Sequence, residues 1–184
     1  MDVVIVGDGP GGLSAALFLV RGGLDIRVYG QDKTAMHWAM LNNYLGVEEM
    51  LGSDFQEICK KQVAAAGVEL VMEKVKAIDR QGDAFQITLQ SGDSVEARYV
   101  ILSEGQMPRL AKTLGLDHDE ESGVATDRNS RTSEAGVYVV GRASRPGRSQ
   151  AVISAGDGAA AAVDILSQEK GEAYCDWDEP PKEG

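Results

Sequence analysis

Apolar runs and glycine clusters alternate along the first thirty residues. Residues 3–6 read VVIV, an apolar run without alternation, which is typical of a parallel strand buried on both faces. Between residues 10 and 21 the apolar positions recur at helical spacing, and the glycines at 22 and 23 end the predicted helix. The segment LDIRVYG, 24–30, has the composition of a second strand. Strand, glycine turn, helix and strand together predict a βαβ unit with a right-handed crossover.

Further helical and β-prone segments follow. A helix is predicted over 53–67, with Ser53 as its N-cap and Gln56 at the third helical position. Three β-prone stretches separated by RQG and SGD predict an antiparallel meander that returns to a buried strand. They cover residues 68–79, 83–90 and 93–105. The run GVYVVG at 136–141 predicts another buried strand, and residues 150–168 predict an alanine-rich helix.

Three segments lack a regular period. Residues 33–52 are expected to form a long loop or a short broken helix, and 106–123 a polar surface excursion. The Pro- and Glu-rich tail, 171–184, is expected to fray. The predicted fold class is α/β, a parallel sheet with helices plus an antiparallel β meander.

Composition narrows the classes of partner. The chain has 184 residues, 43% of them hydrophobic and 26% charged, which suits one domain with a packed core. Its net charge of −11 argues against nucleic acid or an anionic membrane as a partner, since both require clustered Lys and Arg. Cys59 and Cys175 form no C-x-x-C pair, and no apolar run resembles a signal peptide or a membrane span. We therefore expect a cytoplasmic protein with reduced thiols.

The glycine cluster after the first strand matches G-x-G-x-x-G through Gly7, Gly9 and Gly12. Its place between a predicted strand and a predicted helix favours a dinucleotide site. There the first glycine makes the turn, the second admits a pyrophosphate, and the third allows close packing of helix and strand. The helix N-terminus would add N–H groups and partial positive charge beneath the phosphates. The alternative is a tight turn that binds no ligand.

Such sites usually carry an acidic residue at the end of the second strand, where it binds the adenosine ribose. That position is Gly30 in this chain. Asp32 could reach the ribose from two residues further on, or the backbone at Gly30 and Gln31 could make the contact. Asp32 could equally be a solvated turn residue.

Several segments, in order along the chain, resemble the FAD half of the thioredoxin reductase family of pyridine nucleotide-disulfide oxidoreductases. They are DVVIVGDGPGGLSAALFLVRGGLDIRVYG, NNYLG, YVILSEG, ATDRNSRTSEAGVYVVG and SQAVISAGDGAAAA. The resemblance implies a Rossmann-like FAD-binding domain over residues 1–184. In this interpretation 1–105 and 123–170 match the two FAD halves of the family, and 171–184 form a C-terminal tail.

The resemblance also assigns cofactor-binding residues. The FAD pyrophosphate would lie on Gly7, Gly9, Pro10, Gly11 and Gly12. The other implied contacts are Asn43 at the flavin edge, the backbone around Val75 at the adenine, Gly105 in the A-T-G position, Gly141 beside the ribityl chain, and Gln150 with Ala151 at the flavin pyrimidine ring. Trp38 and Tyr44 lie in the loop where the family covers the flavin, and either stacking on the ring or burial in the core is expected.

The chain departs from the family pattern between its two FAD halves. The NADPH domain of the family is replaced by the short bridge 106–123, and the catalytic C-x-x-C is absent with it. The family's A-T-G becomes Ser103-Glu104-Gly105, and the Asp after Gly141 becomes Arg142. These departures resemble the single-domain thioredoxin reductase related subgroup.

Arg142 lies in GRASRPGR together with Arg145 and Arg148, a basic loop within an acidic chain. Arg142 is expected either to bind the FAD diphosphate or to be an exposed loop residue. The loop as a whole could also accept the phosphates of NADPH. No metal site is expected, because His37 and His118 share no ligand spacing with each other or with the cysteines.

The sequence therefore predicts an FAD-dependent oxidoreductase that is not a self-sufficient thioredoxin reductase. Electrons would pass between NAD(P)H or a partner reductase and an unidentified acceptor, and the chain would form a homodimer as related reductases do. Two alternatives remain open. One is a non-catalytic FAD-containing module for dimerisation or partner binding, and the other is an NAD-binding protein.

Overall fold

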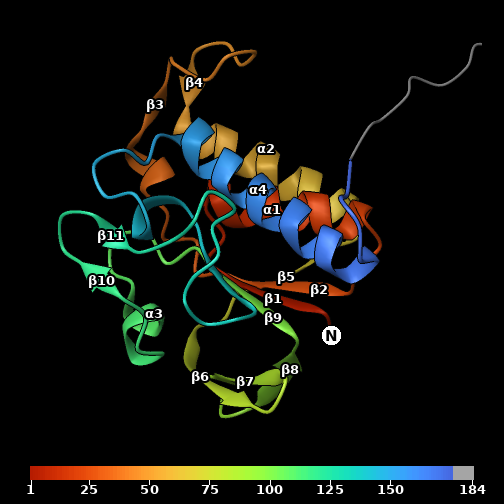
Figure 1. Cartoon of the computed structure of the whole chain (residues 1–184). Coiled ribbons are helices and arrows are strands. Elements are labelled where there is room, and N and C mark those ends of the chain that lie inside the picture. Colours follow the sequence, from red (N-terminus) through yellow and green to blue (C-terminus); the bar gives the residue numbers. More distant parts are fainter. Residues whose placement is uncertain (176–184) are drawn as a thin grey trace, which may run out of the picture.

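The structure is a computed structural model that describes residues 1–175 (Figure 1). Five parallel strands form the central sheet, in the order β12-β9-β1-β2-β5. They are β1 (Val3–Val6), β2 (Ile26–Tyr29), β5 (Glu69–Val71), β9 (Tyr99–Leu102) and β12 (Val137–Val139). The predicted strand–helix–strand unit is confirmed, since β1 pairs in parallel with β2 across α1 (Pro10–Arg21).

The carboxyl ends of the central strands meet in register at one edge of the sheet. Val6 at the end of β1 lies opposite both Tyr29 of β2 and Leu102 of β9, and Val139 of β12 lies opposite Leu102. The loops that begin after these strands therefore leave from the same edge. In open α/β sheets this edge is where ligands bind.

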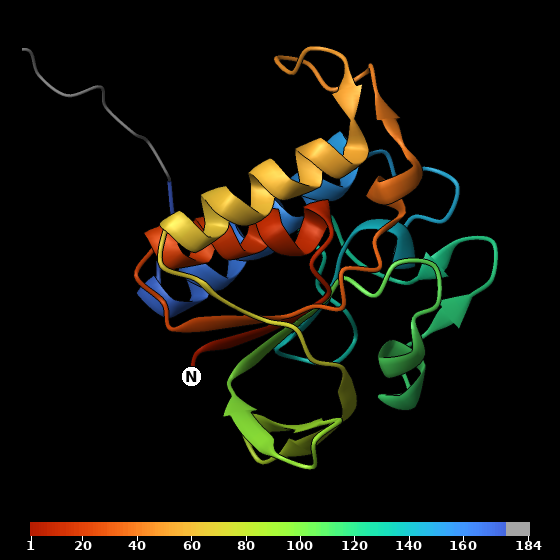
Figure 2. The same ribbon diagram turned by 180° about the vertical axis from the view of Figure 1, so that it is seen from behind.

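Two different layers cover the sheet. Helices α1, α2 (Gly52–Ala65) and α4 (Ala151–Lys170) lie on one face, and an antiparallel sheet of β6 (Val75–Gln81), β7 (Ala84–Leu89) and β8 (Ser94–Ala97) lies on the other (Figures 1 and 2). Successive side chains of β1 point to opposite faces of the sheet, so Val3 and Ile5 pack with the helices and Val4 packs with the meander. This arrangement explains why the strand is apolar throughout.

Helices α1 and α4 pack closely because glycines line their contact. A Cβ at Gly158 of α4 would lie 2.0 Å from the carbonyl oxygen of Gly11 in α1. At the other end of α1, a Cβ at Gly22 would lie 2.3 Å from a methyl carbon of Leu166. The close packing holds the start of α4 beside the glycine-rich turn. No helix within residues 1–175 is long and apolar enough to cross a membrane.

The predicted meander is confirmed only in part. The first β-prone stretch breaks after Val71 into β5, which joins the parallel sheet, and β6, which begins the meander. The third stretch breaks at Arg98 into β8 of the meander and β9 of the central sheet. Both breaks occur where the chain passes from one sheet to the other. The pattern of apolar residues does not indicate to which sheet a strand belongs.

The predicted N-cap of α2 is wrong. The helix begins at Gly52, one residue before Ser53, and its N-cap is Leu51. Gly52 lies against the preceding turn, where its N–H donates to the carbonyl oxygen of Ala39 at 2.8 Å. Gln56 does not close a capping box, because its side-chain amide donates to the carbonyl oxygen of Asp8.

The irregular segments contain short elements. Residues 33–52 form the 3-10 helix η1 (Ala35–Trp38) and the antiparallel pair β3 (Met40–Leu41) and β4 (Met50–Leu51). The bridge 106–123 contains α3 (Arg109–Thr113) and β10 (His118–Asp119), which pairs with β11 (Gly123–Val124). A second 3-10 helix, η2 (Gly141–Ala143), follows β12. Most of the predicted tail, residues 176–184, lies outside the described residues.

Candidate dinucleotide site

The glycine-rich turn between β1 and α1 has a backbone that side chains would obstruct. Gly7 has a φ of +106°, and a Cβ on it would lie 2.1 Å from the carbonyl oxygen of Ser103. A Cβ on Gly12 would lie 2.0 Å from the carbonyl oxygen of Gly7. Both glycines are therefore required by the packing of the protein itself.

Gly9 is different, because the space beside it is open. A Cβ there would meet only Thr34 Oγ1, at 3.5 Å. Gly9 is also the N-cap of α1, and no side chain caps the N–H groups of the first turn. Pro10 occupies the first turn, where its missing N–H costs nothing. The turn thus combines an exposed approach to the backbone with N–H groups that can bind an anion.

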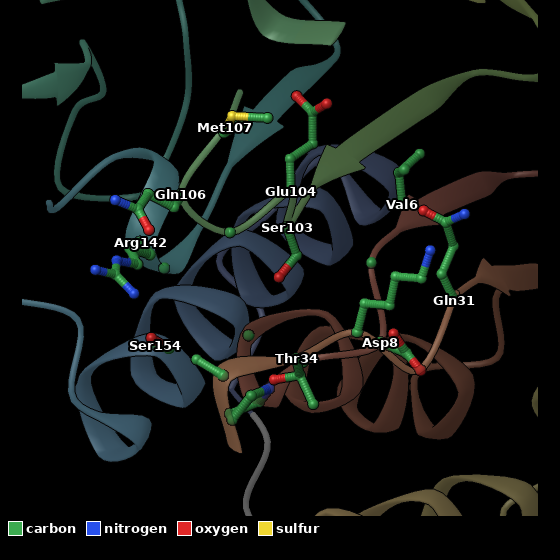
Figure 3. A pocket seen from close by; sticks show the side chains of 18 of the residues that line it. Val6, Asp8, Gln31, Thr34, Ser103, Glu104, Gln106, Met107, Arg142 and Ser154 are labelled. Carbon is green, nitrogen blue, oxygen red and sulfur yellow. The ribbon is translucent and has the colours of Figure 1, made fainter. Parts of the chain in front are cut away.

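A cavity of about 720 Å³ opens along this edge of the sheet. This volume lies within the range of small-molecule sites. Figure 3 shows Val6, Asp8 and Gln31 at one end of the cavity and Gln106 with Arg142 at the other. Ten of the residues predicted to bind the cofactor line it. They are Gly7, Gly9, Pro10, Gly11, Gln31, Val75, Gly105, Gly141, Arg142 and Ala151.

The other four predicted residues do not line the cavity in the described structure. Gly12 packs against Gly7. Asn43 and Gln150 are exposed and contact each other, with Asn43 Nδ2 donating to Gln150 Oε1 at 3.3 Å. Gln150 is the N-cap of α4 and is flanked by Ser149 and Ala151, which do line the cavity. The fold therefore joins these two residues from distant segments beside the cavity.

Asp32, the fourth residue, is held by other side chains. Its backbone is left-handed, with a φ of +53°, and its carboxylate pairs with Lys60 and with His37 Nε2 at 3.2 Å. The hydrogen bond from Lys60 lowers the pKa of Asp32, although partial burial opposes the shift. Asp32 is thus part of an ion cluster beside the turn and is not directed into the cavity.

The arginines of the basic loop after β12 have different roles. Arg145 Nε lies 3.0 Å from Oδ1 of the buried Asp157, whose Oδ2 accepts the N–H of Gly141 at 3.3 Å. Arg145 therefore anchors the loop to α4. Arg142 lines the cavity and forms no ion pair within residues 1–175. Of the three arginines, Arg142 is the one that the structure places at the site.

Trp38 and Glu104 also line the cavity, and from the sequence only Trp38 was considered as a contact of the flavin. Trp38, from the irregular loop, lines the cavity and is 84% exposed, so the expectation of burial in the core is wrong for it. Glu104 is the second residue after the end of β9, and its two carboxylate oxygens accept the N–H groups of Leu110 at 2.8 Å and Ala111 at 3.1 Å. Burial raises the pKa of Glu104, and these hydrogen bonds act in the opposite direction. Its position shortly after a predicted buried strand is the feature of the sequence that could have identified it.

The thiols do not contribute a redox pair to this cavity. Cys59 and Cys175 are both free. Burial raises the pKa of the Cys59 thiol to about 11, which leaves it protonated at neutral pH. Within the described residues, no three His, Cys, Asp or Glu side chains come together as metal ligands.

Comparison with known proteins connects this geometry to a family. A thioredoxin reductase from Helicobacter pylori is 31% identical over 133 residues, covering 68% of this chain and 42% of that protein. A thioredoxin reductase from Peptoclostridium acidaminophilum is 32% identical over 149 residues, covering 76% of this chain and 46% of that protein. The chain thus spans less than half the length of these relatives.

The fold is also shared with solved structures. A thioredoxin reductase from Gloeobacter violaceus superposes with a TM-score of 0.86 at 19% identity, covering 97% of this chain and 98% of that one. The family model described as pyridine nucleotide-disulphide oxidoreductase matches residues 1–49 and 40–158. The Rossmann-like fold, the glycine-rich turn and these matches agree, and the chain belongs to the thioredoxin reductase-like proteins of the pyridine nucleotide-disulphide oxidoreductase family.

Proposed function

We propose that the chain binds FAD along the 720 Å³ cavity and acts as a flavin-dependent oxidoreductase. The observation that carries this proposal is the open backbone at Gly9, next to an uncapped helix N-terminus. A diphosphate needs both features, because it must approach the main chain closely and its charge must be met by N–H groups. Membership of an oxidoreductase family supports the same cofactor.

The two ends of the cavity suit the two halves of FAD. The adenosine would lie toward Gln31 and the backbone of Val75, beyond the end of β2. The flavin would lie toward Ala151 and the Asn43–Gln150 contact at the start of α4. The positive end of α4 would then face the flavin ring and favour negative charge on it. Arg142 would meet the diphosphate or the ribityl side from the loop after β12.

FAD, when bound, supplies hydride and single-electron transfer at its ring, so the protein needs no acid, base or nucleophile of its own for that step. The residues of the chain would hold and orient the cofactor. Glu104 is not assigned as a proton donor, because both of its oxygens already accept backbone N–H groups of α3. Exposed Trp38, which lines the cavity, would be available to contact the bound cofactor.

We further propose that this chain alone does not reduce thioredoxin. Such a reaction requires a dithiol that exchanges with the disulfide of the substrate, and the sequence contains no C-x-x-C pair. The bridge 106–123 also leaves no inserted domain between the two parts of the site. The electron donor would be NAD(P)H bound directly at the flavin or a partner reductase, and the setting would be the cytoplasm.

The test is the visible absorption spectrum of the purified protein, followed anaerobically as NADH and then NADPH is added. A bound-flavin spectrum that bleaches is the expected result, and it would separate direct hydride transfer from dependence on a reductase. A bound flavin that stays oxidised would assign the donor role to a partner protein. Absence of flavin, even after incubation with FAD, would overturn the proposal.

A second candidate function rests on exposed apolar side chains. The β3–β4 segment projects from the body of the molecule (Figure 2) and carries Met40, Leu45 and Leu51, which are 52%, 97% and 51% exposed. Apolar groups on a projecting hairpin favour contact with a protein partner. The chain could then use FAD as a structural element in a homodimer or a partner complex.

Sedimentation of the wild-type protein and of Leu45→Glu distinguishes these uses. A homodimer that dissociates in the variant, with the flavin spectrum unchanged, would assign the hairpin to dimerisation. Monomeric wild-type protein would contradict the homodimer. The matched control is Ile58→Glu, which places the same charge on the exposed side of α2.

A further inference from the structure

The end of β2 has no side chain to bind a ribose. In dinucleotide-binding folds an acidic residue near this point binds the ribose hydroxyls, but Gly30 stands directly after β2. The space beside Gly30 is nevertheless filled. A Cβ on Gly30 would lie 2.5 Å from Cγ and 2.8 Å from Oδ2 of Asp8. The carboxyl group of Asp8 therefore occupies the region into which a side chain at position 30 would extend.

Asp8 reaches this region from the glycine-rich turn. The residue is 6% exposed and lines the cavity, at the same end as Gln31 (Figure 3). Its Oδ2 accepts the N–H of Asp32 at 3.2 Å and lies 3.4 Å from Lys60 Nζ. Within residues 1–175, Oδ1 has no hydrogen-bond donor. Because Asp8 lines the cavity, this oxygen is available to accept a hydrogen bond from a ligand hydroxyl.

Lys60 reduces the repulsion between the Asp8 carboxylate and a diphosphate bound nearby. Its ammonium group lies between Asp8 and Asp32, and it is only partly exposed. Burial alone would lower the pKa of Lys60, but the hydrogen bond from Lys60 to Asp32 and the charges of both carboxylates raise it. Lys60 is therefore charged and offsets the negative charge of Asp8. Asp32, the candidate suggested by the sequence, is occupied by this lysine and by His37.

We propose that Asp8 provides the carboxylate that binds the vicinal ribose diol of the adenosine, in place of a residue at the end of β2. This inference rests on the proposed dinucleotide site and names the residue that recognises its ribose. Oδ1 accepts a hydroxyl of the ribose while Oδ2 stays fixed by Asp32 N–H and Lys60. A 2′-phosphate would be rejected, because it would bring negative charge against the carboxylate.

The geometry makes positions 8 and 30 mutually exclusive. A side chain at position 30 requires that Asp8 be shortened, since the two would overlap at 2.5 Å. A carboxylate supplied from either position would reach the same region. The pair therefore allows a test by exchange, in which the acid is removed from the turn and restored at the end of β2.

Calorimetric titration with ADP and 2′-deoxy-ADP tests the proposal, because ADP carries the ribose diol without the flavin. We expect the wild-type protein to bind ADP about 10-fold more tightly than 2′-deoxy-ADP. In Asp8→Ala the ADP affinity should fall by about 10-fold and the preference should disappear. The double variant Asp8→Ala/Gly30→Glu should recover the preference. Asp32→Asn, the matched control from the same ion cluster, should keep it.

Equal wild-type affinities for the two nucleotides would overturn the assignment of Asp8, as would a preference that survives in Asp8→Ala or is lost in Asp32→Asn. If a thermal melt shows that Asp8→Ala is unfolded, the affinities for ADP and 2′-deoxy-ADP are compared in Asp8→Asn and in the double variant. Failure of the wild-type protein to bind both FAD and ADP would instead overturn the proposed function. The two failures are thus distinguishable.

Discussion

The two ends of the cavity are built in different ways. At the β1–α1 end the backbone is confined, because a methyl group on Gly7 or Gly12 would lie about 2 Å from a carbonyl oxygen and Asp8 is buried against Gly30. At the α4 end the polar groups are exposed, and Asn43 and Gln150 are joined by one hydrogen bond of 3.3 Å. The first end is fixed by packing before any ligand arrives, whereas the second depends on surface side chains.

This difference indicates where the chain can vary. In the proposed binding mode, backbone groups and one carboxylate would recognise a diphosphate and a ribose, and such contacts leave few acceptable substitutions. The α4 end, where the flavin ring is proposed to lie, carries exposed polar side chains. Substitutions there should therefore change cofactor properties with little effect on folding.

The largest effect is expected for Gly7→Ala compared with Gly9→Ala. Gly7 has a positive φ and no room for a methyl group, so alanine should reduce the free energy of unfolding by about 3 kcal/mol or more, or prevent folding. Gly9→Ala should change it by no more than about 0.5 kcal/mol, because the space beside Gly9 is open. The same methyl group should lower FAD affinity at least about 10-fold, since it would stand in the path of the diphosphate.

Urea unfolding and flavin fluorescence titration provide the two measurements. If Gly9→Ala were as destabilising as Gly7→Ala, the turn would be a purely structural feature. If Gly9→Ala bound FAD with wild-type affinity, the diphosphate would have to lie elsewhere.

An intermediate effect is expected at Glu104, in the middle of the cavity. Burial raises the pKa of Glu104 in the folded protein, so the folded state holds the proton more strongly than the unfolded state. This contribution to stability is fully present below the unfolded pKa, and it is lost as the pH rises through the folded pKa. The measurement is the unfolding free energy of wild-type protein and of Glu104→Gln from about pH 3.5 to about pH 7. The wild-type protein should lose stability relative to the variant as the pH rises.

The control for that series is Glu96→Gln, an exposed glutamate on β8. This variant removes a solvent-exposed carboxylate in place of a buried one, so it shows what the loss of a surface glutamate alone does to the unfolding free energy. A wild-type minus Glu104→Gln difference that grew with pH would show that the N–H groups of α3 stabilise the charged carboxylate more than burial opposes it.

The smallest effect on folding is expected for Gln150→Ala. Its hydrogen bond to Asn43 is exposed, so the free energy of unfolding should change by no more than about 0.5 kcal/mol. The visible spectrum of bound flavin should nevertheless shift, because the start of α4 would lie beside the ring. Gln90→Ala, an exposed glutamine outside the cavity, should leave the spectrum unchanged. An unaltered spectrum in Gln150→Ala would place the ring away from α4.

The sequence by itself determined the βαβ unit, the strand at 137–139 and the long helix α4, because each depends on apolar spacing within one short segment. It also located the glycine-rich turn. Gly7, Gly9 and Gly12 must each lack a side chain for a reason set within a few residues of the chain, so their spacing is visible in the sequence. The tertiary structure decided how the β-prone stretches were divided between two sheets. That division depends on which strand is available to pair, and such pairings join residues far apart in the chain.

The chemistry of the site divides in the same way. Local motifs indicated which backbone segments would surround a dinucleotide, and ten of the predicted residues do line one cavity. Only the fold brought Asn43 to Gln150, bound Asp32 to Lys60, and placed the Asp8 carboxyl group in the space left by Gly30. These contacts join separate loops and helices at one sheet edge, and their geometry is set by packing that no single segment encodes.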